Sequence, residues 1–153
     1  MSTWYNKIVD NLSNIVPCID YFENELEEAK YECGIKGSLE RLSAALPGIT
    51  EQRFNQLQEI EAILEHLNIK LRKERSKVFR TYLESYNRQL TSRDADKFVD
   101  GEDSVISLTE LCNQFSMLRN KYLGIMKGLD QKSWQIGHIT RLRTAGMEDI
   151  VIS

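Results

Sequence analysis

The chain is poor in the residues that make turns. Its 153 residues include only two prolines and eight glycines, which is too little turn chemistry for an all-β fold. Cys18, Cys33 and Cys112 form an odd set without a CxxC pair. No signal peptide is visible, and three cysteines without such a pair are typical of reduced thiols in a cytosolic protein. The apolar runs are far too short for a membrane span, so we expect a cytoplasmic, helical protein.

Signatures of catalysis and of metal binding are missing as well. The sequence has no P-loop and no GxGxxG motif. His66 and His138 are isolated, with no Cys or acidic residue at a metal-ligand spacing. Residues 91–104 lack both the register and the closing Glu of an EF-hand. We therefore expect no enzymatic activity, no catalytic residue, no bound metal and no cofactor.

Charge is segregated along the chain, although the net charge is only −3. Residues 1–69 carry a net charge of −7 and residues 70–93 a net charge of +6. Residues 94–118 return to −5, and residues 119–153 carry +3. Such zoning favours a defined anionic partner over diffuse attraction.

The densest basic zone is Lys70–Arg80, K-L-R-K-E-R-S-K-V-F-R, with six cations and one acid. On a helix, its spacings of three, four and three place four cations on one stripe. Two aromatic rings lie beside the end of this stripe, a combination that suits a single-stranded nucleic-acid backbone and its unstacked bases. The candidate DNA-binding residues are Lys70, Arg72, Lys73, Arg75, Lys77, Phe79, Arg80 and Tyr82.

The two rings are expected to differ in role. The helix that carries these cations has an apolar seam at spacings of three and four, which Val78 and Tyr82 extend, so Tyr82 should be at least half buried. Phe79 lies nearer the basic flank and is the better candidate for stacking on bases. The alternative to DNA binding is that the whole stretch is a solvated helix face, with some cations paired to Glu74. Runs of charged residues usually have this role.

The helical spacing of apolar residues predicts an all-α fold, an elongated helical hairpin or bundle with a long central helix. Four segments are expected along the chain. They are an N-terminal helical region (1–49), a long basic DNA-binding helix (50–93), an acidic connection (94–104), and a C-terminal oligomerisation helix and tail (105–153).

Capping and breaking residues set the expected boundaries in the first half. Residues 1–16 read as a weakly structured arm, after which Pro17 opens a helix that Gly34 ends. A short helix then stops before Pro47-Gly48, and Thr50 caps the long helix. Five acids of the first helix are interpreted as a solvated face: Glu23, Glu25, Glu27, Glu28 and Glu32.

In the second half, the long helix is expected to end near Leu90, and Gly101 is the favoured turn point of the acidic connection. The last helix begins near Ser104 or Ser107. Gly124 and Gly128 either permit close backbone approach or mark a break in this helix.

Seven apolar residues of the last helix follow spacings of three and four over three heptads, the a/d pattern of a coiled coil. This seam serves either the core of one chain or self-association, and the unbroken spacing with the glycine pair favours self-association. The ring of Trp134 is expected in the core rather than as a platform for bases. The seam consists of Leu108, Leu111, Phe115, Leu118, Tyr122, Ile125 and Leu129.

Two stretches resemble a known family. R-N-K-Y-L-G-I-M-K-G-L-D-Q-K-S-W-Q-I-G-H-I-T-R-L-R, Arg119 to Arg143, resembles the C-terminal region of the UvsY-like recombination mediators of tailed phages. S-R-D-A-D-K-F-V-D-G-E-D, Ser92 to Asp103, looks like the variants of marine relatives. The likeness covers roughly residues 50–149.

The resemblance implies a non-enzymatic accessory protein of phage DNA recombination and repair, acting in the host-cell cytoplasm. Members of this family are helical, bind single-stranded DNA, and form rings of six or seven subunits through the C-terminal region. They contact the phage recombinase and the phage single-strand-binding protein, and help the first displace the second. The family's basic and aromatic DNA-binding stretch matches residues 70–82 in kind. The alternative is a coiled-coil scaffold protein that binds no nucleic acid.

Overall fold

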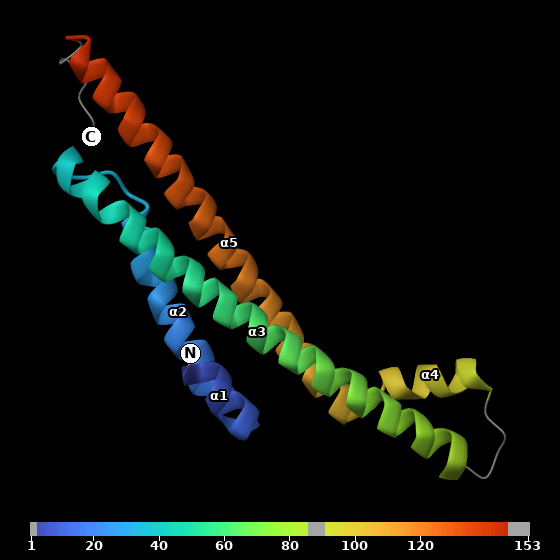
Figure 1. The fold of residues 1–153 in the computed structure, drawn as a ribbon. Helices are drawn as coiled ribbons and strands as arrows, with labels where there is room; N and C mark the ends of the chain where they lie inside the picture. The colour runs from blue at the N-terminus through green and yellow to red at the C-terminus, as the bar shows by residue number, and fades with distance from the viewer. Residues whose placement is uncertain (1–2, 86–90, 147–153) are drawn as a thin grey trace. The chain divides into compact units, whose positions relative to one another are not determined.

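The computed structural model describes residues 3–85 and 91–146. Within these ranges every regular element is helical (Figure 1), which confirms the all-α fold and its long central helix. The elements are α1 (Thr3–Asp10), a 3₁₀ turn η1 (Leu12–Asn14), α2 (Ile15–Glu32), α3 (Leu39–Ser85), α4 (Ser92–Asp100) and α5 (Asp103–Thr144).

The helices form two compact units. Unit 1 combines Met1–Ile15 with Glu59–Arg119, and unit 2 combines Val16–Gln58 with Asn120–Ser153. The long helices α3 and α5 contribute to both units, so each unit is assembled from two distant stretches of sequence.

The first segment of unit 1 is a helix, so the expectation of a weakly structured arm over residues 1–16 is wrong. The backbone N–H groups of Trp4 and Tyr5 donate to Glu59 Oε1 of α3 at 3.0 and 3.3 Å. The first N–H groups of a helix have no acceptor within it, and here a carboxylate 55 residues away supplies one. Ile8 is 1% exposed. Because the Glu59 carboxylate is distant in sequence, the local pattern did not show this contact.

Helix α3 continues through Pro47 and Gly48, so the break expected there is wrong. A proline in a helix interior costs about 3 kcal/mol. Pro47 and Gly48 are themselves exposed, but Leu46 beside them is only 8% exposed, and its burial offsets part of that local cost. Thr50 is not an N-cap, because its hydroxyl donates to the Leu46 carbonyl at 2.8 Å inside the helix. The end expected near Leu90 lies outside the described residues.

Part of the expected acidic connection is the helix α4. The Asp94 N–H donates to Thr91 Oγ1 at 3.2 Å, and the Thr91 hydroxyl donates to the Asp94 carboxylate at 2.9 Å. This cap satisfies one of the first backbone N–H groups of the helix, while Ala95 and Val99, four residues apart, are buried. Gly101 is the C-cap, at the expected turn point. The acids of this segment favoured a connection in the sequence, although the cap and the spacing of Ala95 and Val99 are those of a short helix.

Helix α5 is unbroken from Asp103 to Thr144, so of the two explanations for its glycines, the break is wrong. A Cβ atom built on Gly128 would lie 2.9 Å from Cys33 Sγ. Glycine at this position therefore permits close approach of the chain after α2. A Cβ atom on Gly124 meets no other atom within 4 Å, so close approach explains only one of the pair.

The a/d seam of α5 is buried within a single chain. Five members are at most 7% exposed, and Leu108 and Leu111 are partly exposed. In unit 2, the Tyr122 hydroxyl donates to the Phe22 carbonyl at 3.1 Å. The expectation that this seam mediates self-association is therefore wrong, because the chain buries most of it in its own core. Heptad spacing shows that a helix face packs on other helices, but not whether these belong to the same chain. The buried members are Phe115, Leu118, Tyr122, Ile125 and Leu129.

Candidate nucleic-acid interface

The basic stripe lies on the part of α3 that belongs to unit 1. Lys73, Lys77 and Arg80 are exposed and Lys70 is partly exposed. The seam on another side of the same helix supplies core residues, which are at most 6% exposed: Ile60, Ile63, Leu64 and Leu67. One side of α3 therefore packs while the stripe faces solvent. We call these four cations, Lys70, Lys73, Lys77 and Arg80, the α3 stripe.

The six cations of this stretch divide into paired and unpaired groups. The Arg72 guanidinium lies 3.3 Å from a carboxylate oxygen of Glu65, and Arg75 lies 2.8 Å from Asp100. Neither arginine belongs to the α3 stripe. Among the residues that the structure describes, no carboxylate forms an ion pair with any of the four stripe cations. The stripe therefore keeps its positive charge available to an external anion.

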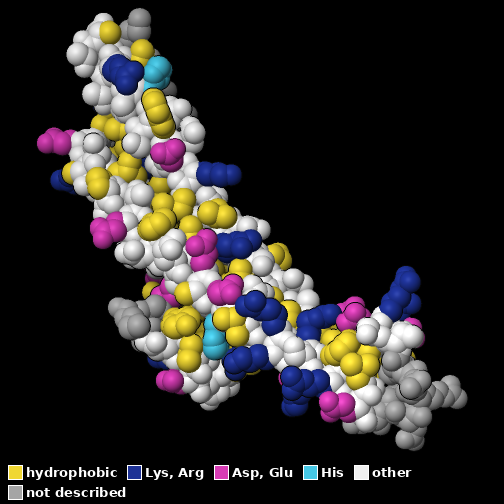
Figure 2. Space-filling model, turned by 45° about the vertical axis from the view of Figure 1, so that its right-hand side comes forward, with side chains coloured by type: hydrophobic (Ala, Val, Ile, Leu, Met, Phe, Trp, Pro, Cys, Tyr) yellow, Lys and Arg dark blue, Asp and Glu magenta, His cyan; other side chains and the backbone are white. Residues whose placement is uncertain are grey.

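Several of these cations converge on one shallow hollow of the α3 surface. Its rim contains four cations and a single acid, so an anion seated there would meet a strongly positive field. Figure 2 shows dark blue Lys and Arg side chains gathered over this part of the chain. The hollow is lined by Arg72, Lys73, Ser76, Lys77, Arg80, Thr81 and Glu84.

The aromatic end of the stretch packs against α4. The Tyr82 ring stacks on Phe98 with centroids 5.3 Å apart and an interplanar angle of 22°, and its hydroxyl donates to the Glu102 carboxylate. The prediction that Tyr82 is at least half buried is confirmed. Phe79 is also partly buried, and it lines a second hollow with Asp96 and Val99 of α4. A base stacking on Phe79 would therefore share that surface with an acidic helix.

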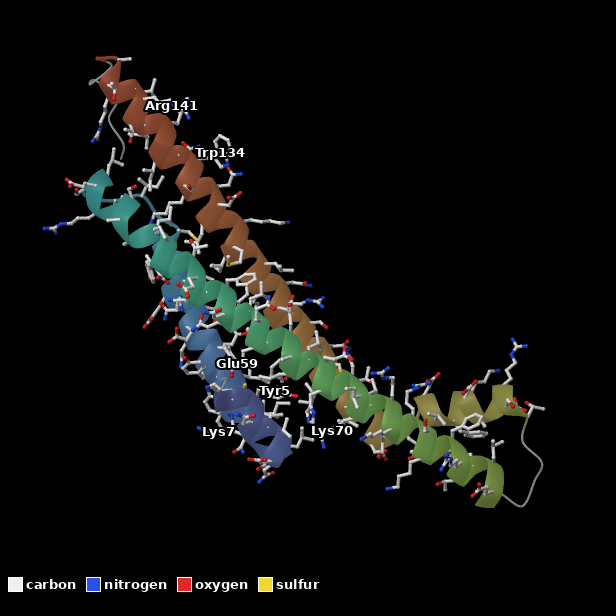
Figure 3. All side chains as sticks on the ribbon, in the orientation of Figure 1. Tyr5, Lys7, Glu59, Lys70, Trp134 and Arg141 are labelled. Atoms are coloured by element: carbon white, nitrogen blue, oxygen red, sulfur yellow. The ribbon has the colours of Figure 1, made fainter. Side chains whose placement is uncertain are left out.

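His66 lies beside the α3 stripe. Its Nε2 atom is buried without a hydrogen-bond partner among the described residues, and its ring meets Tyr5 edge-on with centroids 6.2 Å apart. Burial, followed by the charges of Lys70 and Lys73, lowers the pKa of His66 below its ordinary value. The imidazole is thus held neutral, and Figure 3 labels its neighbours Tyr5 and Lys70.

A second charged cluster, in unit 2, is structural. Arg53 is 2% exposed, and its guanidinium lies 2.6 Å from Glu25 Oε2 and 2.7 Å from Glu32 Oε1. Burial raises the pKa of Glu25, but hydrogen bonds from Gln56 and Arg53 and the arginine charge outweigh it, so the net pKa is lowered. These two acids are not simply a solvated face as expected, because they neutralise a buried cation.

Cys33 and Cys112 lie in surroundings that disfavour the thiolate. Burial raises the pKa of Cys33 and of Cys112, which keeps both thiols protonated. Within residues 3–85 and 91–146, no three His, Cys, Asp or Glu side chains come together at metal-binding geometry. In the same ranges, no helix combines the length and the apolar character of a membrane span.

Comparisons with protein-family models, with curated proteins and with solved structures give no match to this chain. The geometry of the α3 stripe and the resemblance described from the sequence are therefore the grounds for a functional proposal.

Proposed function

We propose that this chain binds single-stranded DNA through the α3 stripe and acts as a recombination mediator. The observation that supports this most is the set of four cations on one side of α3 that make no ion pair with the described acids. Arginine and lysine that neutralise phosphates release counterions, which gives sequence-independent, salt-sensitive binding. Single strands also expose base faces, and Phe79 places a partly exposed ring at the end of the stretch, whereas the Tyr82 ring is already stacked on Phe98.

The mediator role adds two protein partners, a phage recombinase and a phage single-strand-binding protein. The resemblance of residues 50–149 to the UvsY-like family supports this step. One stripe would bind weakly, but a homo-oligomer, such as a ring of six or seven subunits, would multiply the contacts through effective concentration. Because α5 buries most of its a/d seam in its own chain, the subunit contacts of such a ring would involve other surfaces.

The test is a fluorescence-anisotropy titration of a labelled oligo(dT) with the full chain at two salt concentrations, together with a duplex of equal length. We expect binding that weakens steeply with salt and prefers the single strand. No binding at the lower salt concentration would contradict the proposal and favour the scaffold alternative. Salt-independent binding would exclude the α3 stripe as its source.

A further inference from the structure

A second stripe runs along the part of α5 that belongs to unit 2. Its members follow spacings of four, three, four and three, so they share one side of the helix, and all five are exposed. The opposite side of the same stretch is buried, with Leu129, Lys132 and Ile136 at 1%, 4% and 7% exposure. We call these five residues the α5 stripe: Lys127, Gln131, Trp134, His138 and Arg141.

Trp134 is the unusual member of the α5 stripe. Its side chain is 68% exposed, so the expectation that it packs in the core is wrong. Figure 3 shows Trp134 and Arg141 on the same side of α5, directed away from α3. A tryptophan in this position adds little to the packing of its own chain, because most of it is open to solvent.

The charge of this part of α5 is also poorly neutralised. Residues 120–144 contain five cations and one acid. The acid, Asp130, is exposed and lies three residues from Lys127 and four from Trp134, so it borders the same side of the helix. Two of the cations act inside the unit, since Lys121 pairs with Glu23 at 3.2 Å and Lys132 donates to the Glu32 carbonyl at 2.5 Å. Lys127 and Arg141 form no ion pair with any acid that the structure describes.

We infer that the α5 stripe is a second contact site for single-stranded nucleic acid. Trp134 stacks on one base, as exposed rings do on sequence-tolerant binding surfaces. Lys127 and Arg141 each lie seven residues away, about 10 Å along the helix, and bind phosphates on either side of that base. This inference rests on the proposed function and adds an independent surface to it.

The composition of the α5 stripe favours nucleic acid over a protein partner. Protein interfaces are enriched in Trp and Arg but depleted of Lys, and they bury their aromatic anchors in cores that are poor in charge. Trp134 is instead flanked by Gln131 and His138 on its own stripe, with the two cations beyond them. Amide and imidazole groups can hydrogen-bond base edges, and the cations suit a phosphate backbone.

The experiment uses the two tryptophans of the chain as reporters. Trp4→Phe leaves Trp134 as the only indole, and Trp134→Phe leaves only Trp4. Each variant is titrated with oligo(dT) while emission is recorded, and anisotropy of a labelled oligo(dT) reports total binding. We expect strong, salt-reversible quenching in Trp4→Phe and little in Trp134→Phe. If Trp4→Phe folds poorly, the difference between wild type and Trp134→Phe reports the same quenching.

Charge variants test the phosphate contacts. Adding Lys127→Gln and Arg141→Gln to Trp4→Phe should reduce the quenching severalfold, whereas Tyr31→Ala, at an 86% exposed ring of α2, should leave it unchanged. If Trp134 emission is quenched equally with and without the two charge substitutions, the inference is wrong. Binding by anisotropy without any change in Trp134 emission would overturn it too and would leave the proposed function standing. Absence of binding in both measurements would reject both proposals.

Discussion

Arg53 and Lys73 are both cations on α3, but their surroundings are opposite. Arg53 is 2% exposed and ion-paired closely with Glu25 and Glu32, with Glu28 at 3.9 Å. Lys73 is exposed and makes no ion pair with the acids that the structure describes. A buried charge is tolerated only with close partners. Arg53 therefore serves the fold, and Lys73 remains available to an external anion.

Removing the Arg53 guanidinium should destabilise unit 2. Arg53→Ala leaves Glu25 and Glu32 without their shared cation, and breaking a buried pair in this way costs about 3–5 kcal/mol. Urea unfolding followed by circular dichroism measures the change. Arg41→Ala, at an exposed cation of the same helix, is the control and should shift stability by less than about 0.5 kcal/mol. Equal unfolding midpoints for the two variants would show that the Arg53 cluster contributes little.

His66 should make stability depend on pH. Its folded-state pKa lies below the ordinary value of 6.5, so the unfolded chain binds the proton more readily. The stabilisation is complete above the unfolded pKa and is lost as pH falls through 6.5 toward the folded pKa. Unfolding free energies between about pH 7.5 and 5.5 should therefore decrease in wild type, with a flatter profile in His66→Gln.

The control for this pH profile is His138→Gln, which replaces the exposed histidine of α5 and should keep the wild-type slope. An unchanged slope in His66→Gln would mean that another group causes the pH dependence.

At the scale of elements, α4 modifies the basic end of α3. It brings Asp100 to Arg75 at 2.8 Å and Phe98 onto Tyr82, and it places Asp96 beside Phe79. An acidic helix thus occupies part of the surface that single-stranded DNA would use. The basic stretch is more available along its exposed stripe than at its aromatic end.

The two rings should separate in their effects. Tyr82→Ala removes the stack on Phe98 and the hydrogen bond to Glu102, so it should cost about 1–3 kcal/mol of stability. Phe79→Ala should weaken single-strand binding, by up to about 1–3 kcal/mol if a base stacks there, with less loss of stability. Thermal melting and single-strand binding are measured for both variants. A larger loss of stability in Phe79→Ala and a larger loss of binding in Tyr82→Ala would contradict these roles.

Releasing Arg75 should strengthen DNA binding. Asp100→Asn removes its carboxylate partner, and one added phosphate contact should steepen the salt dependence by roughly 0.7 on a single strand. Glu110→Gln, at an exposed acid of α5, changes the net charge equally and serves as the control. Equal gains in affinity for the two variants would indicate a general charge effect instead of a local one.

The elements that the sequence predicted well are those whose signal is local and repeated. Spacings of three and four along α3 and α5 indicated both long helices and the phase of Tyr82. Two of the errors involve contacts that a local pattern does not show: Glu59 caps α1 from another helix, and Leu46, beside Pro47 in α3, is buried by packing. The cap at Thr91 is a local signal, but the many acids around it favoured the prediction of a polar connection instead of a helix.

At the scale of the whole molecule, two units are each built from stretches far apart in sequence. Periodicity cannot show how distant stretches combine, which is why the seam of α5 was assigned to another chain when its own chain buries it. For the candidate site, spacing identified the α3 stripe. It did not identify the pairing of Arg75, because Asp100 comes 25 residues later, nor the exposure of Trp134.

If the α3 stripe binds single-stranded DNA, its unpaired cations should set the affinity and its salt dependence. The most direct test is the salt dependence of oligo(dT) affinity for Lys73→Ala/Lys77→Ala, compared with Lys36→Ala/Arg41→Ala, which removes two exposed cations elsewhere. We predict that the stripe variant binds more weakly, with a salt slope flatter by roughly 0.7 for each lost phosphate contact, and that the control stays close to wild type. Unchanged affinity and slope in the stripe variant would contradict the account.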